Sequence, residues 1–115
     1  MVNSRVDYCD TETFQASCSS PDEVVMIERA SYGRMRLGRC VETDMGYVGC
    51  QADVLQTADR RCSGRISCQV RVPDAELEKT RPCLRELKTY LEITYRCLTG
   101  TQQLLIEVTR HTFVQ

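Results

Sequence analysis

Residues 23–30, EVVMIERA, decide the fold class, because they have the pattern of a β-strand and not of a surface helix. Residues 24–27 within this stretch are four consecutive apolar side chains, which is typical of a strand that is buried on both faces. Residues 31–34, SYGR, come next. Gly33 can adopt backbone angles that other residues avoid, so we expect the strand to end at this segment.

Strand patterns recur on both sides of this stretch. Residues 12–18 and 67–72 have the length and composition of short strands. Residues 89–97, TYLEITYRC, alternate most clearly, so we expect one face to pack in a core and the other to be partly exposed. The residues expected on the core face are Leu91, Ile93 and Tyr95.

One segment changes to the period of a helix. Residues 54–61, VLQTADRR, place apolar side chains on one face, and Asp53 is the expected N-cap. Arg60 and Arg61 fall in the last turn, where positive charge complements the helix dipole. The charged stretch 74–81, between two prolines, is expected to be a loop or a short helix. The chain is therefore predicted to be one domain, mainly β with one or two short helices (α+β).

Eight cysteines are spread along almost the whole chain of 115 residues. An even number of cysteines in so short a chain indicates a disulfide framework, which persists in an oxidising compartment. Structural zinc is the alternative, but zinc ligands usually come as close Cys-x-x-Cys or His pairs. The closest pair here, Cys62 and Cys68, is separated by five residues, and the single histidine, His111, follows the last cysteine. We expect disulfides, with no metal and no other cofactor, while spacing alone leaves about 105 connectivities open.

Charge and hydropathy exclude several classes of function. The formal net charge is −1, so no surface of a single sign is expected to hold a nucleic acid. No run of residues has the length and apolarity of a membrane span, so we expect that the domain itself does not insert into a membrane. Residues 1–5 lack the apolar stretch of a signal peptide. If the chain is secreted, its numbering is expected to begin after a removed signal.

Three motifs resemble those of a known family, in the same order and with similar spacing. They are VMIERASYGR at residues 25–34, RCSGRISCQV at residues 61–70, and PC at residues 82–83 followed by KTYLEITYRC at residues 88–97. The chain resembles the rhamnose/galactose-binding lectin family, also called the sea-urchin-egg-lectin type, from its first cysteine to its last. Within that family it is most similar to the N-terminal lectin-like domain of latrophilin adhesion receptors, and next to the lectin domains of EVA-1-type receptors.

The resemblance implies a compact, disulfide-stapled β-sandwich and a connectivity for the cysteines. The pairs implied are Cys9–Cys40, Cys18–Cys97, Cys50–Cys83 and Cys62–Cys68. The lectin-like domain would occupy residues 1–98, and residues 99–115 would form a C-terminal linker or an extra strand at residues 103–108.

The resemblance also implies a sugar pocket, which is altered in this chain. In sugar-binding members a Glu on the signature strand, an Asp before Pro-Cys, a Lys in the next loop and the Tyr of the Tyr-Gly-Arg turn surround the ligand. Glu28 and Tyr32 match, but Arg81 occupies the place of the Asp and cannot accept a hydrogen bond. Either Lys88 or Thr89 takes the place of the Lys. The frequent Asn of the signature is replaced as well, by Ser31.

Each candidate residue also has a plain structural interpretation. Glu28 and Arg81 are compatible with an ion pair across the pocket, Tyr32 with a packing role, and Lys88 with a solvated loop charge.

The altered pocket leads to two hypotheses about function. The first is an extracellular recognition domain of a membrane-anchored adhesion receptor, which binds the ectodomain of another protein, teneurin-like or of the leucine-rich-repeat class. The alternative is a carbohydrate-binding lectin for rhamnose, galactose or, because Arg81 can pair with a carboxylate, an acidic sugar. Catalysis is not expected, because no histidine precedes Cys97 and the cysteines are assigned to disulfides.

Overall fold

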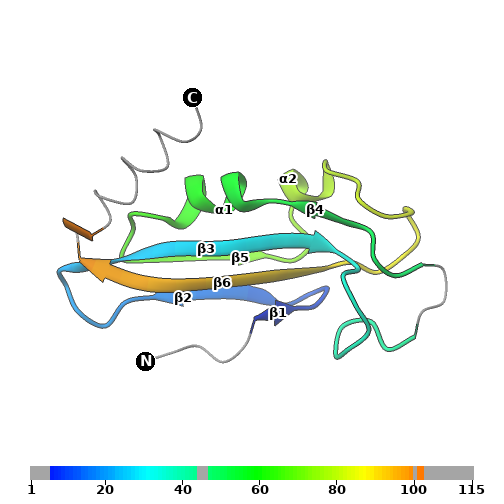
Figure 1. Ribbon diagram of the computed structural model, residues 1–115, viewed down its shortest axis with the longest axis horizontal. Coiled ribbons are helices and arrows are strands. Elements are labelled where there is room, and N and C mark those ends of the chain that lie inside the picture. Colours follow the sequence, from blue (N-terminus) through cyan, green and yellow to red (C-terminus); the bar gives the residue numbers. More distant parts are fainter. Residues whose placement is uncertain (1–5, 44–46, 100, 103–115) are drawn as a thin grey trace.

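Two antiparallel sheets and two short helices form the part of the chain that the computed structural model describes, residues 6–43, 47–99 and 101–102. The four-stranded sheet has the order β1 (Asp7–Tyr8), β6 (Tyr90–Thr99), β3 (Glu23–Gly33) and β4 (Gln51–Asp53). The second sheet pairs β2 (Thr13–Ser17) with β5 (Ser67–Arg71). The strands expected at residues 12–18, 67–72 and 89–97 are confirmed (Figure 1). The strand expected at residues 103–108 lies outside the described residues.

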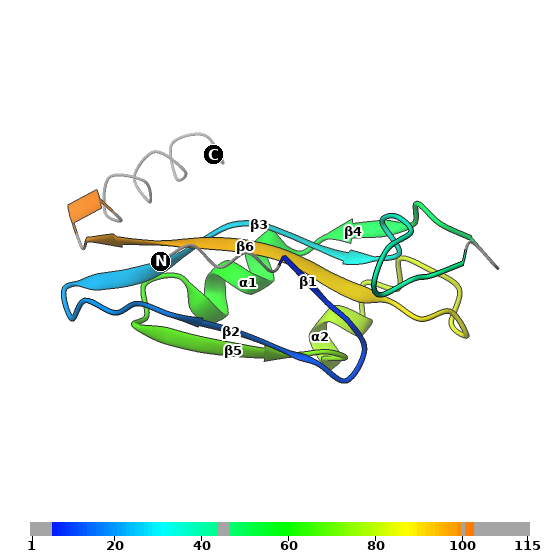
Figure 2. The same ribbon diagram turned by 90° about the horizontal axis from the view of Figure 1, so that it is seen from below.

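The two sheets form the layers of a sandwich, with a helix on one side. Figure 2 shows the β2–β5 pair as the second layer, and Figure 1 shows α1 (Leu55–Cys62) along one side of the two sheets. The other helix, α2 (Ala75–Glu78), follows β5 near the far end of that layer. The core lies between the layers, and its fully buried side chains include Phe14, Ile27, Leu77, Leu91 and Ile93. The expected disulfide-stapled α+β sandwich is thus confirmed.

The signature strand β3 is longer than expected. Residues 31–33 do not end it, because they pair on both sides, with β4 from Asp53 to Gln51 and with β6 from Glu92 to Tyr90. The strand therefore continues past residue 30, where we expected it to end, and stops within the predicted segment, at Gly33. Gly33 has φ +150°, and a Cβ added there would lie 2.3 Å from the carbonyl oxygen of Cys50. A glycine is needed at this position because the backbones of β3 and β4 approach closely.

A bulge in β3 determines which of its side chains enter the core. The register with β6 shifts between Ile27 and Arg29, which leaves Glu28 as the extra residue. Val25 and Ile27 face the core before the bulge, and Ala30 and Tyr32 face it afterwards. The extra residue therefore keeps apolar side chains on the same face of the sheet along the whole strand. Both Glu28 and Arg29 are exposed as a consequence.

Helix α1 begins one residue later than predicted and ends one residue later. The assigned N-cap is Val54, while the side chain of Asp53 still accepts a hydrogen bond from the backbone N–H of Leu55 at 2.9 Å. Arg60 and Arg61 lie in the last turn, as expected. They also connect α1 to α2, because both pair with acidic residues at the start of that short helix.

Asp74 is the residue on which this connection depends most. Its carboxylate accepts hydrogen bonds from the backbone N–H groups of Glu76 at 2.9 Å and Leu77 at 3.2 Å, which caps α2. It also accepts a hydrogen bond from Nη1 of Arg61 at 2.7 Å. The bond from Arg61 is the main reason why the pKa of Asp74 lies below its ordinary value.

Asp74→Ala is expected to lower the free energy of unfolding by about 1–2 kcal/mol at neutral pH, because it removes the cap of α2. Since the folded-state pKa of Asp74 is depressed, its contribution is present above the unfolded-state pKa of about 3.9. That contribution is lost as the pH falls through the folded-state value. Asp74→Asn keeps a cap without the charge, so it should restore part of the stability but not the pH dependence. Urea unfolding at neutral and at acidic pH measures both effects, and an Asp74→Ala protein as stable as the parent would contradict the role of the cap.

All eight cysteines form disulfides, with the connectivity expected from the family resemblance. The bridges are Cys9–Cys40, Cys18–Cys97, Cys50–Cys83 and Cys62–Cys68. No cysteine is left as a zinc ligand, because every sulfur is bonded to another. None of the helices among the described residues is long and apolar enough to cross a membrane.

Candidate functional site

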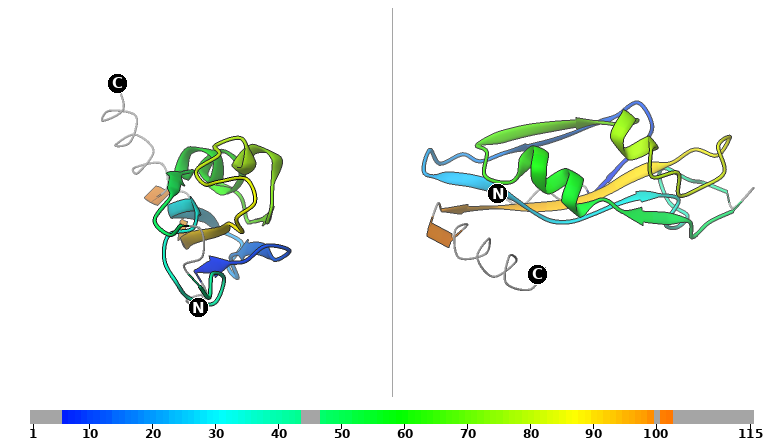
Figure 3. Two further views of the ribbon diagram at one scale, coloured as in Figure 1. Left: turned by 90° about the vertical axis from the view of Figure 1, so that its right-hand side faces the viewer. Right: turned by 90° about the horizontal axis from the view of Figure 1, so that it is seen from above.

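Three loop segments meet at one end of the molecule. They lie at the end opposite Thr99 and are the turn 9–12, the segment around residues 34–43 and 47–50, and the segment 79–89. The right-hand view of Figure 3 shows the second and third of these segments at that end. Two disulfides join them: Cys9–Cys40 connects the first to the second, and Cys50–Cys83 connects the second to the third. The backbone positions at this end are therefore held covalently.

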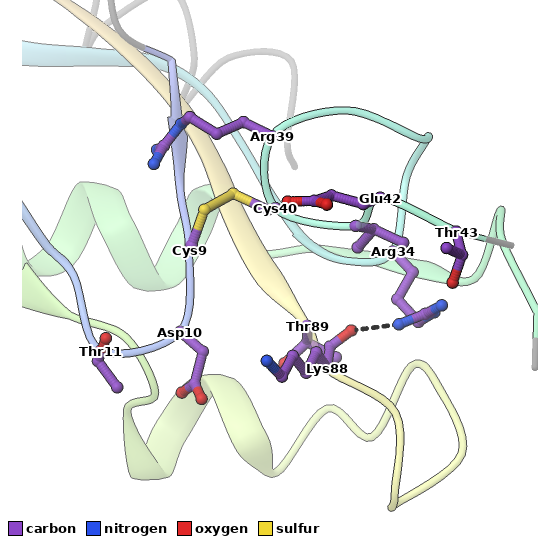
Figure 4. A pocket seen from close by; sticks show the side chains of 11 residues that line it. Cys9, Asp10, Thr11, Arg34, Arg39, Cys40, Glu42, Thr43, Lys88 and Thr89 are labelled. Atoms are coloured by element: carbon purple, nitrogen blue, oxygen red, sulfur yellow. Dashed lines mark hydrogen bonds between the residues drawn. A yellow bond between two sulfur atoms is a disulfide. The ribbon is translucent and has the colours of Figure 1, made fainter. Parts of the chain in front are cut away.

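Two cavities open among these loops. The first has a volume of about 580 Å³ and is called the Asp10 cavity here (Figure 4). Its polar lining includes Asp10, Thr11, Arg34, Glu42, Lys88 and Thr89. The second has a volume of about 540 Å³ and is called the Arg81 cavity. Its polar lining includes Tyr32, Glu78, Lys79, Arg81, Arg85 and Thr89. Both volumes lie within the range of about 300–1,000 Å³ that is usual for small-molecule sites.

A tight turn presents Asp10 to the first cavity. The backbone N–H of Glu12 donates to the carbonyl oxygen of Cys9 at 2.9 Å, which closes the turn. Thr11 has φ +75°, and its N–H donates to the carbonyl oxygen of Val72 at 2.8 Å. Asp10 lies at the tip of this turn and is exposed. Its carboxylate is thus directed by a backbone that is bonded on both sides of it.

Arg34 joins the loops behind the cavity. Its side chain is only 4% exposed, and its guanidinium donates from Nε to the carbonyl oxygen of Tyr47 at 2.6 Å and from Nη1 to that of Lys88 at 2.8 Å. Figure 4 shows this second bond beside the cavity. Arg34 therefore holds the backbone of Lys88 in place, while the Lys88 side chain stays exposed.

The Asp10 cavity is lined by side chains of both charge signs, and several of these side chains have no partner of opposite charge in the described part of the chain. Within the described part of the chain, the side chains of Asp10, Glu42 and Lys88 form no ion pair and no hydrogen bond. Carboxylates accept hydrogen bonds and an ammonium donates three. This arrangement suits a ligand with several neighbouring hydroxyl groups, because each hydroxyl is both a donor and an acceptor.

Tyr32 forms the floor of the Arg81 cavity. Its ring is packed in the core at 1% exposure, and its hydroxyl donates to Oε1 of Glu78 at 2.8 Å. The hydroxyl of Thr89 donates to the Tyr32 oxygen at 2.7 Å. Burial raises the pKa of Tyr32 to about 12, so the phenol stays neutral and both roles expected of it, packing and lining, are compatible.

The candidate residues predicted to share one pocket are divided between two. Lys88 and Thr89 line the Asp10 cavity, whereas Tyr32, Arg81 and again Thr89 line the Arg81 cavity. The two cavities thus adjoin at Thr89.

The two remaining candidates, Glu28 and Ser31, line neither cavity. The alternative interpretation of Glu28, an ion pair with Arg81, is not what the structure has, because Glu28 pairs with Nε of Arg96 at 3.5 Å along the sheet. Ser31 is the neighbour of Tyr32 in β3, and alternation directs it to the opposite face.

Sequence reasoning did not single out Asp10, Arg34 or Glu42. Asp10 follows Cys9, and Glu42 lies two residues after Cys40, so the disulfide between these cysteines brings both acids to one cavity. The implied pairing of Cys9 with Cys40 was the signal that could have located them.

One protein family matches most of the chain. Its sequence model, described as the D-galactoside/L-rhamnose binding SUEL lectin domain, matches residues 16–97. The match contains the strands and helices from the end of β2 to most of β6, and the segment 79–89, whose residues line both cavities. The turn that carries Asp10 precedes the matched residues, so the role of Asp10 is supported by geometry alone.

Proposed function

The chain belongs to the D-galactoside/L-rhamnose binding SUEL lectin domain family, and on this basis we propose that it is an extracellular recognition domain that binds a saccharide in the Asp10 cavity. The four disulfides support an extracellular setting, because such frameworks persist in oxidising compartments. Binding, not catalysis, is the role that this family membership supports.

The observation that carries this proposal is the set of uncompensated charges around one cavity. Asp10 and Lys88 both line it, and neither makes an ion pair with another described residue. Hydrogen bonds to charged groups are stronger than those between neutral groups. A sugar with adjacent hydroxyls can donate to the carboxylate of Asp10 and accept from the ammonium of Lys88 or the hydroxyl of Thr89.

Asp10→Asn and Lys88→Met are each expected to weaken saccharide binding about ten- to a hundredfold, because each removes a charge-assisted hydrogen bond. Titration of the chain with L-rhamnose and with D-galactose, followed by calorimetry or by NMR, measures the affinities. Asp22→Asn is the matched control, since Asp22 is an exposed acid in the connection between β2 and β3. Saccharide binding that is unchanged in Asp10→Asn, or absent from the parent chain, would contradict the proposed site.

A second candidate function is recognition of another protein, as part of a membrane-anchored adhesion receptor. Three large apolar side chains near the cavities are strongly exposed: Leu37 at 51%, Tyr47 at 56% and Leu84 at 65%. Apolar and aromatic side chains of this kind form the centres of protein interfaces. The partner we propose is the ectodomain of a teneurin-like or leucine-rich-repeat protein. Surface binding of such ectodomains, with and without competing saccharide, separates this candidate from the first.

A further inference from the structure

We propose that the Arg81 cavity is a second ligand site, which binds the carboxylate or sulfate group of an acidic saccharide. This inference rests on the proposed binding of a saccharide in the adjoining Asp10 cavity and names the chemical class of that saccharide.

The charge around the cavity is the first argument. Lys79, Arg81 and Arg85 line it, and Glu78 is the one carboxylate among its lining residues, so the formal charge of the lining is +2 (three cations and one anion). Within the described residues, none of the three cationic side chains has a hydrogen-bond or ion-pair partner. Elsewhere, acidic partners pair with Arg36, Arg39, Arg60, Arg61 and Arg96. Three exposed arginines in the described part of the chain also lack an acidic partner, but they line neither cavity: Arg29, Arg65 and Arg71. Uncompensated positive charge therefore gathers at this cavity, where it attracts an anion.

The one carboxylate in the lining is already engaged. Oε1 of Glu78 accepts the hydrogen bond of the Tyr32 hydroxyl at 2.8 Å. No ion pair joins Glu78 to a lysine or arginine among the described residues. Glu78 can balance at most one of the three cations, so the lining keeps a formal charge of +2 that an external anion would compensate.

The position of Arg81 is the second argument. Its φ is +45°, a left-handed conformation that a residue with a Cβ rarely adopts. The backbone is held there by the N–H of Arg81, which donates to the carbonyl oxygen of Glu78 at 3.1 Å, and by the disulfide of Cys83 two residues later. Glycine would be favoured by the backbone alone, so an arginine at this point is explained by what its side chain does. A guanidinium matches the paired oxygens of a carboxylate or sulfate.

The two cavities also share a wall. Thr89 lines both of them, and its hydroxyl is bonded to Tyr32 at the floor of the Arg81 cavity. Leu84 and Leu87 add apolar surface to the same cavity, against which the carbon face of a sugar ring can pack. A ligand of two sugar residues can therefore place a neutral residue at Asp10 and an acidic one beside Arg81.

The test compares three disaccharides that share a neutral galactose residue: one uncharged, one with a uronic acid and one with a sulfate ester. The parent chain is expected to bind at least one acidic form about tenfold more tightly than the uncharged form, and this ratio should fall as salt is added. The two acidic forms distinguish a carboxylate from a sulfate ligand. Inorganic sulfate, titrated alone, shows what the anion contributes without the sugar.

The variant to compare combines Arg81→Gly with Arg85→Gln. Glycine suits the positive φ of position 81, so the fold should be retained while both charges are removed. The ratio of acidic to neutral affinity is expected to fall to about one. Arg65→Gln is the control and should keep the ratio of the parent, because Arg65 is exposed in the turn after α1 and lines neither cavity.

Each outcome decides between the two proposals. Three results would overturn the acidic-saccharide site. They are equal affinity for the three disaccharides, a preference for the acidic forms that survives in the double variant, and binding of free sulfate without any preference among the saccharides. Acidic binding that disappears in the double variant, together with no effect of Asp10→Asn, would support this site and refute the proposed role of the Asp10 cavity.

Discussion

Replacing Cys18 and Cys97 together by alanine is expected to lower the free energy of unfolding by about 4 kcal/mol. The bridge closes the longest loop in the domain, because its cysteines are 79 residues apart in the sequence. In the chain-entropy description, a crosslink over a long loop restricts the unfolded chain most. It joins the residue after β2 to β6 and so ties the two layers together. Since domains of this size are stable by about 5–15 kcal/mol, the loss is a large part of the total.

The Cys62–Cys68 bridge provides the comparison. Its cysteines are only 6 residues apart, so the same description assigns about 2 kcal/mol to the loop it closes. Denaturant unfolding of both double-alanine variants, without reducing agent, gives the two losses directly. Equal losses would show that loop length does not govern the stability of this domain.

Gly33→Ala is expected to lower the free energy of unfolding by about 2–5 kcal/mol, through backbone strain and overpacking. The added methyl group would lie 2.3 Å from the carbonyl oxygen of Cys50 and 2.8 Å from the Cα of Gln51. Both are backbone atoms, so no side-chain rotation relieves the contact. The positive φ of 150° adds strain of its own for any residue with a Cβ.

The same substitution should also weaken ligand binding. The backbone N–H of Arg34 donates to the carbonyl oxygen of Cys50 at 2.8 Å, so moving Cys50 displaces a residue that lines the Asp10 cavity. Gly38→Ala is the matched control, because an added Cβ there has no atom within 4 Å, and its effect should stay within about 0.5 kcal/mol. Urea unfolding and saccharide titration of both variants provide the test. A Gly33→Ala protein that behaves like Gly38→Ala would disprove the close approach of β3 and β4.

Most of the secondary structure could be predicted from local pattern. The alternation of residues 89–97 and the apolar run at residues 24–27 reflect which side chains are buried. Both patterns fall within strands of the structure, β6 and β3 respectively. The extension of β3 through residues 31–33 could not be predicted, because it depends on pairing with β4 on one side and β6 on the other. The bulge at Glu28 is likewise a property of the pair of strands and leaves no mark in local composition.

The candidate site was predictable only in part. The family resemblance led to Tyr32, Arg81, Lys88 and Thr89, all of which line a cavity. It placed them in a single pocket, whereas in the structure they line two cavities that share Thr89. Asp10 is far from these residues in the sequence, and only the three-dimensional course of the chain brings it to the same end of the molecule.

The disulfides Cys9–Cys40 and Cys50–Cys83 have a consequence for how this end of the molecule recognises a ligand. Because they fix the loops before any ligand arrives, little conformational entropy is lost when a ligand binds, and even a few hydrogen bonds suffice for measurable affinity. In such a preorganised site the backbone conformation is set by the disulfides and does not depend on the exposed side chains. Exposed positions such as Arg85 and Glu42 can then be exchanged to change specificity while the covalent frame remains intact.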